Sequence, residues 1–197
     1  MRITPRATAK QASIMAISAA LYAVLFALSY TVALPNFTLL YLPIILLGVF
    51  PIWFGWSGLA GSMVGAFIGG FFVENLAFSA WAEAVTCFII YALNWLLISR
   101  KIAEIRTKRS LIALIGIYAV TLLAGTSFIL WQLVALGFIP AEVAIAAFPT
   151  TYAVNLIIEV IVCSALIRRT TLKLKNWGMY AGTFGDWRSR RASKTEG

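Results

Sequence analysis

The positive charges of this chain occupy three short segments, and long stretches of almost pure hydrocarbon separate them. All sixteen lysine and arginine residues fall within residues 2–10, 100–109 and 168–194. Residues 11–99 and 110–167 contain no positive charge. Basic residues are retained on the cytoplasmic side of a membrane when loops are short, so all three clusters should share that side. The pattern predicts an all-α, polytopic membrane protein.

Composition excludes a soluble globular protein. Hydrophobic residues make up 61% of the 197 residues and charged residues only 12%, whereas soluble domains are roughly 45–50% apolar and about 25% charged. The net charge of +9 would suggest nucleic acid in a soluble chain, but at membrane borders anionic lipid headgroups explain it more simply. Cys87 and Cys163 lie in apolar runs and histidine is absent, so we expect no disulfide, metal site or cofactor.

Four spans of about 20 apolar residues are evident from hydropathy alone. They cover residues 11–34, 77–99, 111–136 and 149–167.

The stretch 37–73 holds either one span or two. The first two basic clusters must share a side, so an even number of spans separates them, and nearly uncharged residues can hardly stay outside the membrane. We therefore expect two spans, 39–54 and 56–73, which meet near Gly55, with Pro51 kinking the first.

The result is a domain of six transmembrane helices with both termini cytoplasmic, in a multi-pass protein of the cell membrane. We expect residues 1–170 to form this single membrane domain. Residues 171–197 should form a basic cytoplasmic tail that contains no further span, because its charges and aromatic residues suit the interface.

Polar side chains inside apolar spans are costly, and they usually face a binding site or a partner helix. Two carboxylates, an amide and several aromatic residues converge toward the outer half of the expected bundle. The predicted substrate-binding residues are Glu83, Trp131, Gln132, Tyr152, Asn155, Glu159, Asn36 and Tyr41. Glu83 should contact the ligand directly, because Glu159 lies deeper. For each residue alone, the alternative is a hydrogen bond between helices or an interfacial aromatic.

The charges also restrict the ligand. No lysine, arginine or histidine lies in any expected outer segment, so nothing there can pair with an anion. A cationic or neutral, donor-rich heterocycle is therefore favoured over a carboxylate vitamin. No motif of a hydrolase, a P-loop ATPase or a zinc protease is present, so we expect no enzymatic activity, and ATP hydrolysis would need another chain.

Small residues recur along the first and third expected spans. Ala12, Ala16 and Ala20 form one row, and a second row with Ala19 and Ala23 lies beside it. Such rows let helices approach closely in lipid, either within the chain or with a partner. The third span carries a glycine stripe that we expect to be structural, formed by Gly58, Gly61, Gly65 and Gly69.

Together these features resemble an S component, the substrate-binding membrane subunit of an energy-coupling factor (ECF) vitamin transporter. The resemblance rests on chain size, six expected spans, the alanine face and the glycine-rich stretch 48–65. In that family an AxxxA pattern on the first helix meets the coupling subunit, and residues 16–20 match it. In the thiamine-binding branch, Glu83 and Asn155 resemble a glutamate on the fourth helix and an asparagine on the sixth, while the branch's histidine has no counterpart here.

Membership implies that the chain captures a micronutrient outside, associates with an ECF coupling transmembrane subunit and two ATPase subunits, and releases the nutrient inside. The strongest alternative is a non-catalytic membrane scaffold similar to the small rod-shape proteins. In a scaffold, Glu83 and Glu159 would pair with other helices and no ligand would bind. A small membrane enzyme that uses the two carboxylates is a third class, with no recognisable motif behind it.

Overall fold

The computed structural model describes residues 5–31, 40–74 and 77–195. Within these residues every regular element is helical, which confirms the predicted all-α class. The elements in chain order are α1 (Pro5–Thr31), α2 (Ile44–Trp53), α3 (Gly55–Glu74), α4 (Ala77–Leu97), α5 (Arg100–Ala103), α6 (Lys108–Ala135), α7 (Ala141–Ile158), the π-helical segment η1 (Glu159–Cys163), α8 (Ser164–Asn176) and α9 (Phe184–Thr195).

Four helical segments are long and apolar enough to cross a membrane, which indicates a multi-pass membrane protein. They are Ala9–Tyr30, Ala80–Leu97, Lys108–Ala135 and Ala141–Asn176. By contrast, α2 has ten residues, so at 1.5 Å per residue it is about 15 Å long, about half the thickness of a bilayer core. The count of six spans and the cytoplasmic location of both termini therefore stay predictions.

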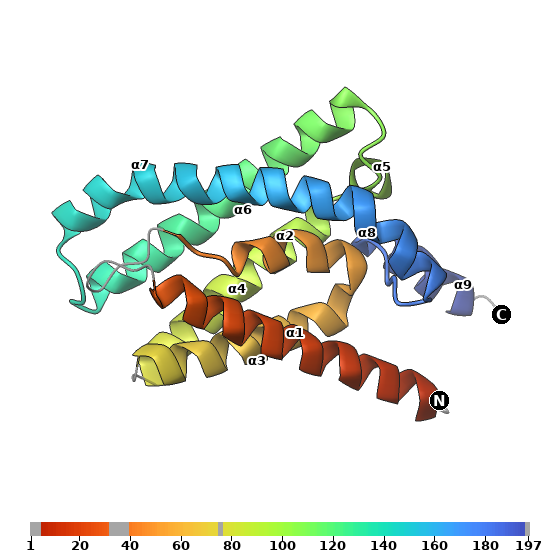
Figure 1. Cartoon of the computed structure of the whole chain (residues 1–197), viewed down its shortest axis with the longest axis horizontal. Coiled ribbons are helices and arrows are strands. Elements are labelled where there is room, and N and C mark those ends of the chain that lie inside the picture. The colour runs from red at the N-terminus through yellow and green to blue at the C-terminus, as the bar shows by residue number, and fades with distance from the viewer. Residues whose placement is uncertain (1–4, 32–39, 75–76, 196–197) are drawn as a thin grey trace.

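The long helices run between two ends of an elongated bundle (Figure 1). The start of α1, the short α5, and the helices α8 and α9 lie at one end, and the connection between α6 and α7 lies at the other. Since the three basic segments belong to the first group, we call this end the basic end.

The glycine stripe of α3 brings that helix into close contact with α1. A Cβ atom at Gly61 would lie 2.7 Å from the Ser18 Cβ, and one at Gly65 would lie 2.7 Å from the Tyr22 Cβ. Farther along, a Cβ at Gly69 would lie 2.8 Å from the ring of Phe26. Helices without a hydrophobic drive to associate need such close backbone approach, so the predicted structural role of these glycines is confirmed.

The break between α2 and α3 occurs at the predicted place. Gly55 has φ +51°, a conformation that side-chain-bearing residues rarely adopt, and this glycine lets the chain reverse after Phe54. The hydroxyl of Tyr91 on α4 donates to the Gly55 carbonyl at 2.6 Å, so the turn is tied to a neighbouring helix.

Pro51 lies inside α2 and lacks an N–H, which leaves the Leu47 carbonyl without its helical partner. The side-chain amide of Asn94 on α4 donates to this carbonyl at 3.1 Å. An unpaired backbone group inside hydrocarbon costs several kcal/mol, so Asn94 offsets the cost of the proline.

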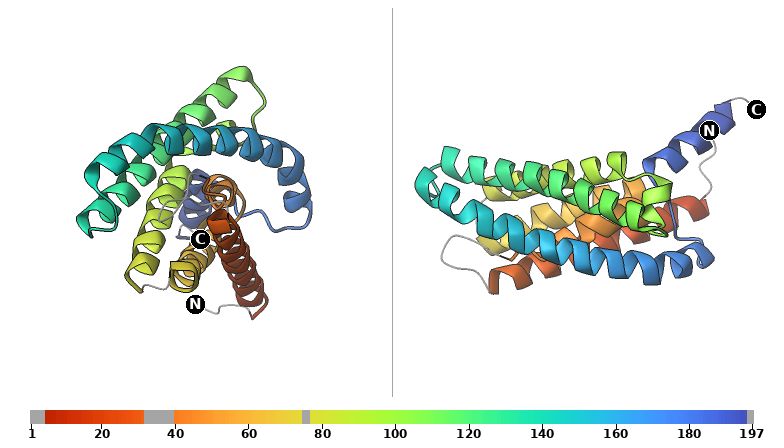
Figure 2. Two further views of the ribbon diagram at one scale, coloured as in Figure 1. Left: turned by 60° about the vertical axis from the view of Figure 1, so that its left-hand side comes forward. Right: turned by 90° about the horizontal axis from the view of Figure 1, so that it is seen from above.

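The last long helix passes through α7, η1 and α8 without a break, and Figure 2 shows it as one curved rod. It ends at Asn176, beyond the predicted end at residue 167 and past the domain boundary expected at residue 170. The tail then forms α9 and packs on the bundle, because the Ala181 N–H donates to the Trp53 carbonyl at 2.6 Å.

Gly65→Ala should lower the stability of the protein even though alanine has the higher helix propensity. The added methyl group meets α1 in a contact that neither backbone can easily relieve, and overpacking of this kind costs about 1–3 kcal/mol. The matched control is Gly116→Ala in α6, where a Cβ meets nothing within 4 Å. Thermal unfolding in one detergent should show a lower midpoint for Gly65→Ala alone. An unchanged midpoint would contradict the packing of α3 on α1.

Candidate ligand-binding site

A cavity of about 110 Å³ lies among α4, α6 and α7, in the half of the bundle away from the basic end. Most of its wall is aliphatic, from residues such as Ile90, Leu122, Ile129, Leu130 and Leu133. The polar side chains that line it are Tyr30, Tyr41, Glu83, Thr86, Thr126, Gln132, Thr151 and Asn155. An apolar wall with a few polar groups is typical of sites for small organic ligands.

Tyr41 joins Glu83 and Asn155, two of the residues predicted from the sequence to bind the ligand. Its hydroxyl donates to the Glu83 carboxylate at 3.0 Å, and its backbone N–H donates to the Asn155 side-chain oxygen at 2.8 Å. Glu83 comes from α4 and Asn155 from α7, and both are buried, with 7% and 2% of their surfaces exposed. Tyr41 therefore bridges helices that are far apart in the chain.

The bridge extends to α1. The Tyr22 and Tyr41 hydroxyls are hydrogen-bonded, and because Tyr41 gives its proton to Glu83, Tyr22 acts as the donor. The Leu42 N–H donates to the Ser29 hydroxyl at 2.9 Å, and that hydroxyl donates to the Leu25 carbonyl at 2.8 Å. Tyr41 and Leu42, which lie just before Pro43 and the start of α2, are thus held by α1, α4 and α7 together.

One acceptor and one hydroxyl on the cavity wall have no hydrogen-bond partner among the described residues. They are the side-chain oxygen of Gln132 and the hydroxyl of Thr151, and both are buried. Asn155, by contrast, donates to the Thr151 carbonyl at 2.8 Å, which fixes the orientation of its amide. A ligand with hydrogen-bond donors could satisfy both groups.

The cavity wall contains one carboxyl group and no basic side chain. Glu83 is the ionisable acid among its lining residues, and none of them is a lysine or arginine. Carboxylates in an apolar setting interact strongly with cations and with donor groups. The arrangement therefore suits a cationic or donor-rich ligand and disfavours an anion, as the sequence predicts.

The structure brings four predicted residues to this cavity: Tyr41, Glu83, Gln132 and Asn155. Trp131 does not line it, since 64% of its surface is exposed and its ring lies beside Phe128 on the outside of α6. Tyr152 donates to the Ala119 carbonyl at 3.0 Å and stacks on Phe148, and it too is absent from the lining. Asn36 lies outside the described residues.

Glu159 belongs to a separate, deeper cluster. It is fully buried at the start of η1, below Gly48 of α2, and neither carboxylate oxygen has a hydrogen-bond partner among the described residues. The Asn94 amide is a hydrogen-bonding neighbour of this carboxylate at a geometry outside the usual limits, while it also donates to the Leu47 carbonyl. The Asn94 oxygen accepts from Thr121 at 2.9 Å. π-Helical segments occur often at functional positions because they reorient a side chain.

Sequence reasoning missed Tyr22, Ser29, Thr126 and Thr151. Tyr22 and Ser29 recur at helical spacing with Ser18 along the buried face of α1, and that polar row was a usable signal. The two threonines carried no signal, because threonine is common in membrane helices as a backbone-bonded residue.

Comparison with protein-family models, with curated proteins and with solved structures gives no match to this chain. The function is therefore argued from the site itself.

Glu159→Met should raise the stability of the protein by about 1–3 kcal/mol, because it replaces an unsatisfied buried carboxylate with an apolar side chain of similar size. The matched control is Glu83→Met, which removes the acceptor of Tyr41 and should lower stability. Thermal unfolding in one detergent would compare the two variants. A lower midpoint for Glu159→Met would mean that Glu159 has a stabilising partner.

Proposed function

We propose that this chain is the substrate-capture subunit of an ATP-driven micronutrient importer. It binds a cationic or neutral heterocycle from outside, and it delivers the ligand together with a coupling membrane subunit and two ATPase subunits in the cell membrane. The proposal assigns no catalytic step to the chain itself. Two observations support this role: the resemblance of the sequence to ECF S components and the polar groups that line the cavity.

The observation that carries the proposal is the polar pattern of the cavity. Glu83 supplies a buried acceptor, Gln132 supplies an open acceptor and Thr151 an open hydroxyl, and the lining contains no lysine or arginine. Unsatisfied buried polar atoms cost free energy, and a cluster of them in one cavity is expected where a ligand completes the hydrogen bonds. A structural core of the same size would gain stability from apolar residues at these positions.

Tyr41 occupies the hydrogen-bonding positions at Glu83 and Asn155 that a ligand would use. Its hydroxyl satisfies Glu83 and its N–H satisfies Asn155. A cationic nitrogen placed at Glu83 would replace a neutral donor by a charge-assisted one, which is about twice as strong. Ligand entry is therefore coupled to a movement of the Tyr41 side chain.

The alanine face offers a surface for the coupling subunit. Ala12, Ala16 and Ala20 are exposed on α1, while Ala19 and Ala23 lie partly covered beside α3. The row is thus free to receive a second helix at short distance, as small-residue faces do in lipid.

A scaffold of the rod-shape type is the second candidate. It is favoured by the pairing of Glu83 and Asn155 with Tyr41, since a scaffold predicts that these polar groups satisfy one another. Ligand binding separates the two functions, because a scaffold binds none.

Glu83→Gln should weaken ligand binding by roughly ten- to a hundredfold, because a charge-assisted hydrogen bond contributes about 1.5–3 kcal/mol. We would identify the co-purified ligand by mass spectrometry and measure its affinity by calorimetry, with thiamine and biotin as cationic and acidic test compounds. The matched control is Glu142→Gln, at an exposed position that does not line the cavity. Tight binding of biotin, or unchanged affinity in Glu83→Gln, would contradict the proposed site.

Ala16→Leu should abolish transport while ligand binding by the isolated chain survives, because leucine adds bulk on the proposed docking face. The control is Ala153→Leu, which adds the same bulk at an exposed position of α7. Uptake in cells and co-purification with the coupling subunit would be measured for both variants. Equal transport by the two variants would show that this face docks nothing.

A further inference from the structure

A second cavity, of about 390 Å³, lies at the basic end, where α5, the end of α8 and α9 come together. Its lining includes Arg100, Lys175, Tyr180, Asp186 and Ser189. This cavity shares no lining residue with the one near Glu83.

The tail builds the cavity by folding back on the bundle. The Ala181 N–H donates to the Trp53 carbonyl at 2.6 Å, and the Lys10 ammonium donates to the Gly178 carbonyl. Phe184 and Trp187 of α9 pack on Trp95 of α4, with ring centroids 5.3 and 6.0 Å away. The tail is therefore anchored from α1, α2 and α4, and its polar residues are held in fixed positions.

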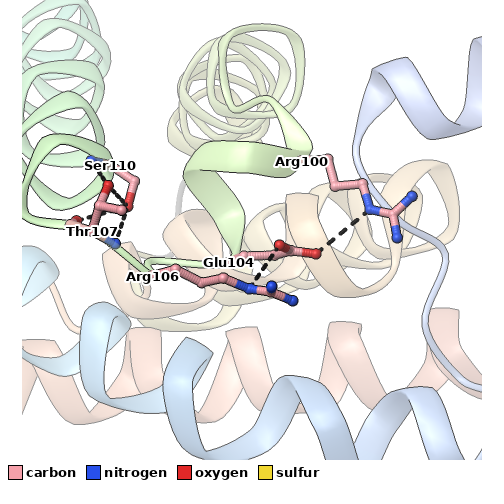
Figure 3. A network of polar contacts seen from close by, with 5 residues as sticks. All are labelled: Arg100, Glu104, Arg106, Thr107 and Ser110. Atoms are coloured by element: carbon pink, nitrogen blue, oxygen red, sulfur yellow. Dashed lines mark hydrogen bonds and ion pairs between the residues drawn. The ribbon is translucent and has the colours of Figure 1, made fainter.

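The terminal nitrogens of Arg100 point away from Glu104, which is the only ion-pair partner of Arg100 among the described residues (Figure 3). Its Nε lies 3.6 Å from the Glu104 carboxylate, which also receives Arg106 at 3.1 Å. Figure 3 shows the two terminal nitrogens of Arg100 pointing away from Glu104. Because guanidinium donors are arranged as a planar fork, these two nitrogens can still hold a phosphate oxygen.

Lys175 supplies the second cation. Its ammonium lies 4.9 Å from the centre of the Tyr180 ring, a cation–π contact that positions it, and no described carboxylate forms an ion pair with it. Asp186 also lines the cavity, but its carboxylate accepts from the Thr183 N–H and hydroxyl, both at 3.0 Å, and so caps α9. Two cations and one carboxylate line the cavity, so its lining has a net charge of +1, which favours an anion.

Apolar side chains beside Lys175 point to a lipid source for that anion. Leu172 lies one turn before Lys175 on α8, and Trp177 follows shortly after it, each with 68% of its surface exposed. Tryptophan at the end of an apolar helix is typical of the headgroup level of a bilayer. Basic pockets between helices at that level bind anionic headgroups.

We propose that this cavity binds the phosphate group of an anionic phospholipid. Arg100 and Lys175 contact the phosphate oxygens, and Tyr180 and Ser189 line the same space. The site would fix the tail and the basic end at the headgroup level. It does not depend on the importer function.

The test uses the full chain in detergent and native mass spectrometry with phosphatidylglycerol and phosphatidylcholine. The double variant Arg100→Gln with Lys175→Gln should bind phosphatidylglycerol at least about tenfold more weakly. The matched control, Lys101→Gln with Lys173→Gln, removes the same charge from exposed neighbours outside the cavity and should change binding less than about twofold. The charge-preserving pair Arg100→Lys with Lys175→Arg checks folding and should retain binding.

Competition with inorganic phosphate at constant ionic strength distinguishes the two sources of a phosphate group. If phosphate fails to displace phosphatidylglycerol, the site takes the lipid, and if it displaces the lipid fully, the site takes a free phosphate compound. Equal losses in the two neutralising variants would overturn the proposal, because the attraction would then be diffuse. The proposal would also be overturned if the wild-type chain bound phosphatidylcholine as tightly as phosphatidylglycerol and if the cavity variant bound both lipids equally well.

Discussion

The fold depends on α2, a helix that is short, almost fully buried and interrupted by a proline. Hydrocarbon offers no water to satisfy backbone groups, so neighbouring helices must do it. Asn94 pairs with the carbonyl that Pro51 leaves open, and Tyr118 donates to the Gly48 carbonyl at 3.1 Å. At its far end, Trp53 donates its indole N–H to the Thr171 hydroxyl at 3.0 Å. Polar residues of three other helices therefore hold α2 in place.

The length of α2 also sets where the ligand cavity forms. Because the helix begins at Ile44, the residues before it form a turn, in which the Ile44 N–H donates to the Tyr41 carbonyl at 3.2 Å. Side chains from α1, α4 and α7 hold Tyr41 and Leu42 in this turn. The cavity lies between α4, α6 and α7, and Tyr41 is part of its lining. The same short helix places Gly48 over Glu159, which closes off the deeper carboxylate. Glu83 therefore lies on the cavity wall, whereas Glu159 is covered by α2.

Sequence alone predicted the helical class, the break at Gly55, the packing role of the α3 glycines and the polar residues of α4 and α7 that meet at the cavity. The sequence did not predict which side of a helix faces the cavity, or how deep in the bundle a side chain lies. Trp131 and Gln132 are neighbours about 100° apart on α6, so only one of them can face the cavity, and the sequence does not say which. Asn155 and Glu159 share a face of one helix, yet only Asn155 lines the cavity.

The two carboxylates represent two ways of keeping an acid inside apolar surroundings. Glu159 is shielded by close packing under Gly48, and among the described residues its carboxylate oxygens have no hydrogen-bond partner within the usual geometric limits. Glu83 has a partner that can leave, because the Tyr41 hydroxyl belongs to a side chain that precedes α2 and not to the rigid core of a long helix. The hydrogen bond from Tyr41 to Glu83 can be exchanged for a stronger, charge-assisted bond from a ligand. This exchange lowers the free-energy cost of ligand entry, and it does not expose the Glu83 carboxylate to lipid. The exchangeable partner therefore makes Glu83, and not Glu159, the carboxylate through which a cationic ligand would be recognised.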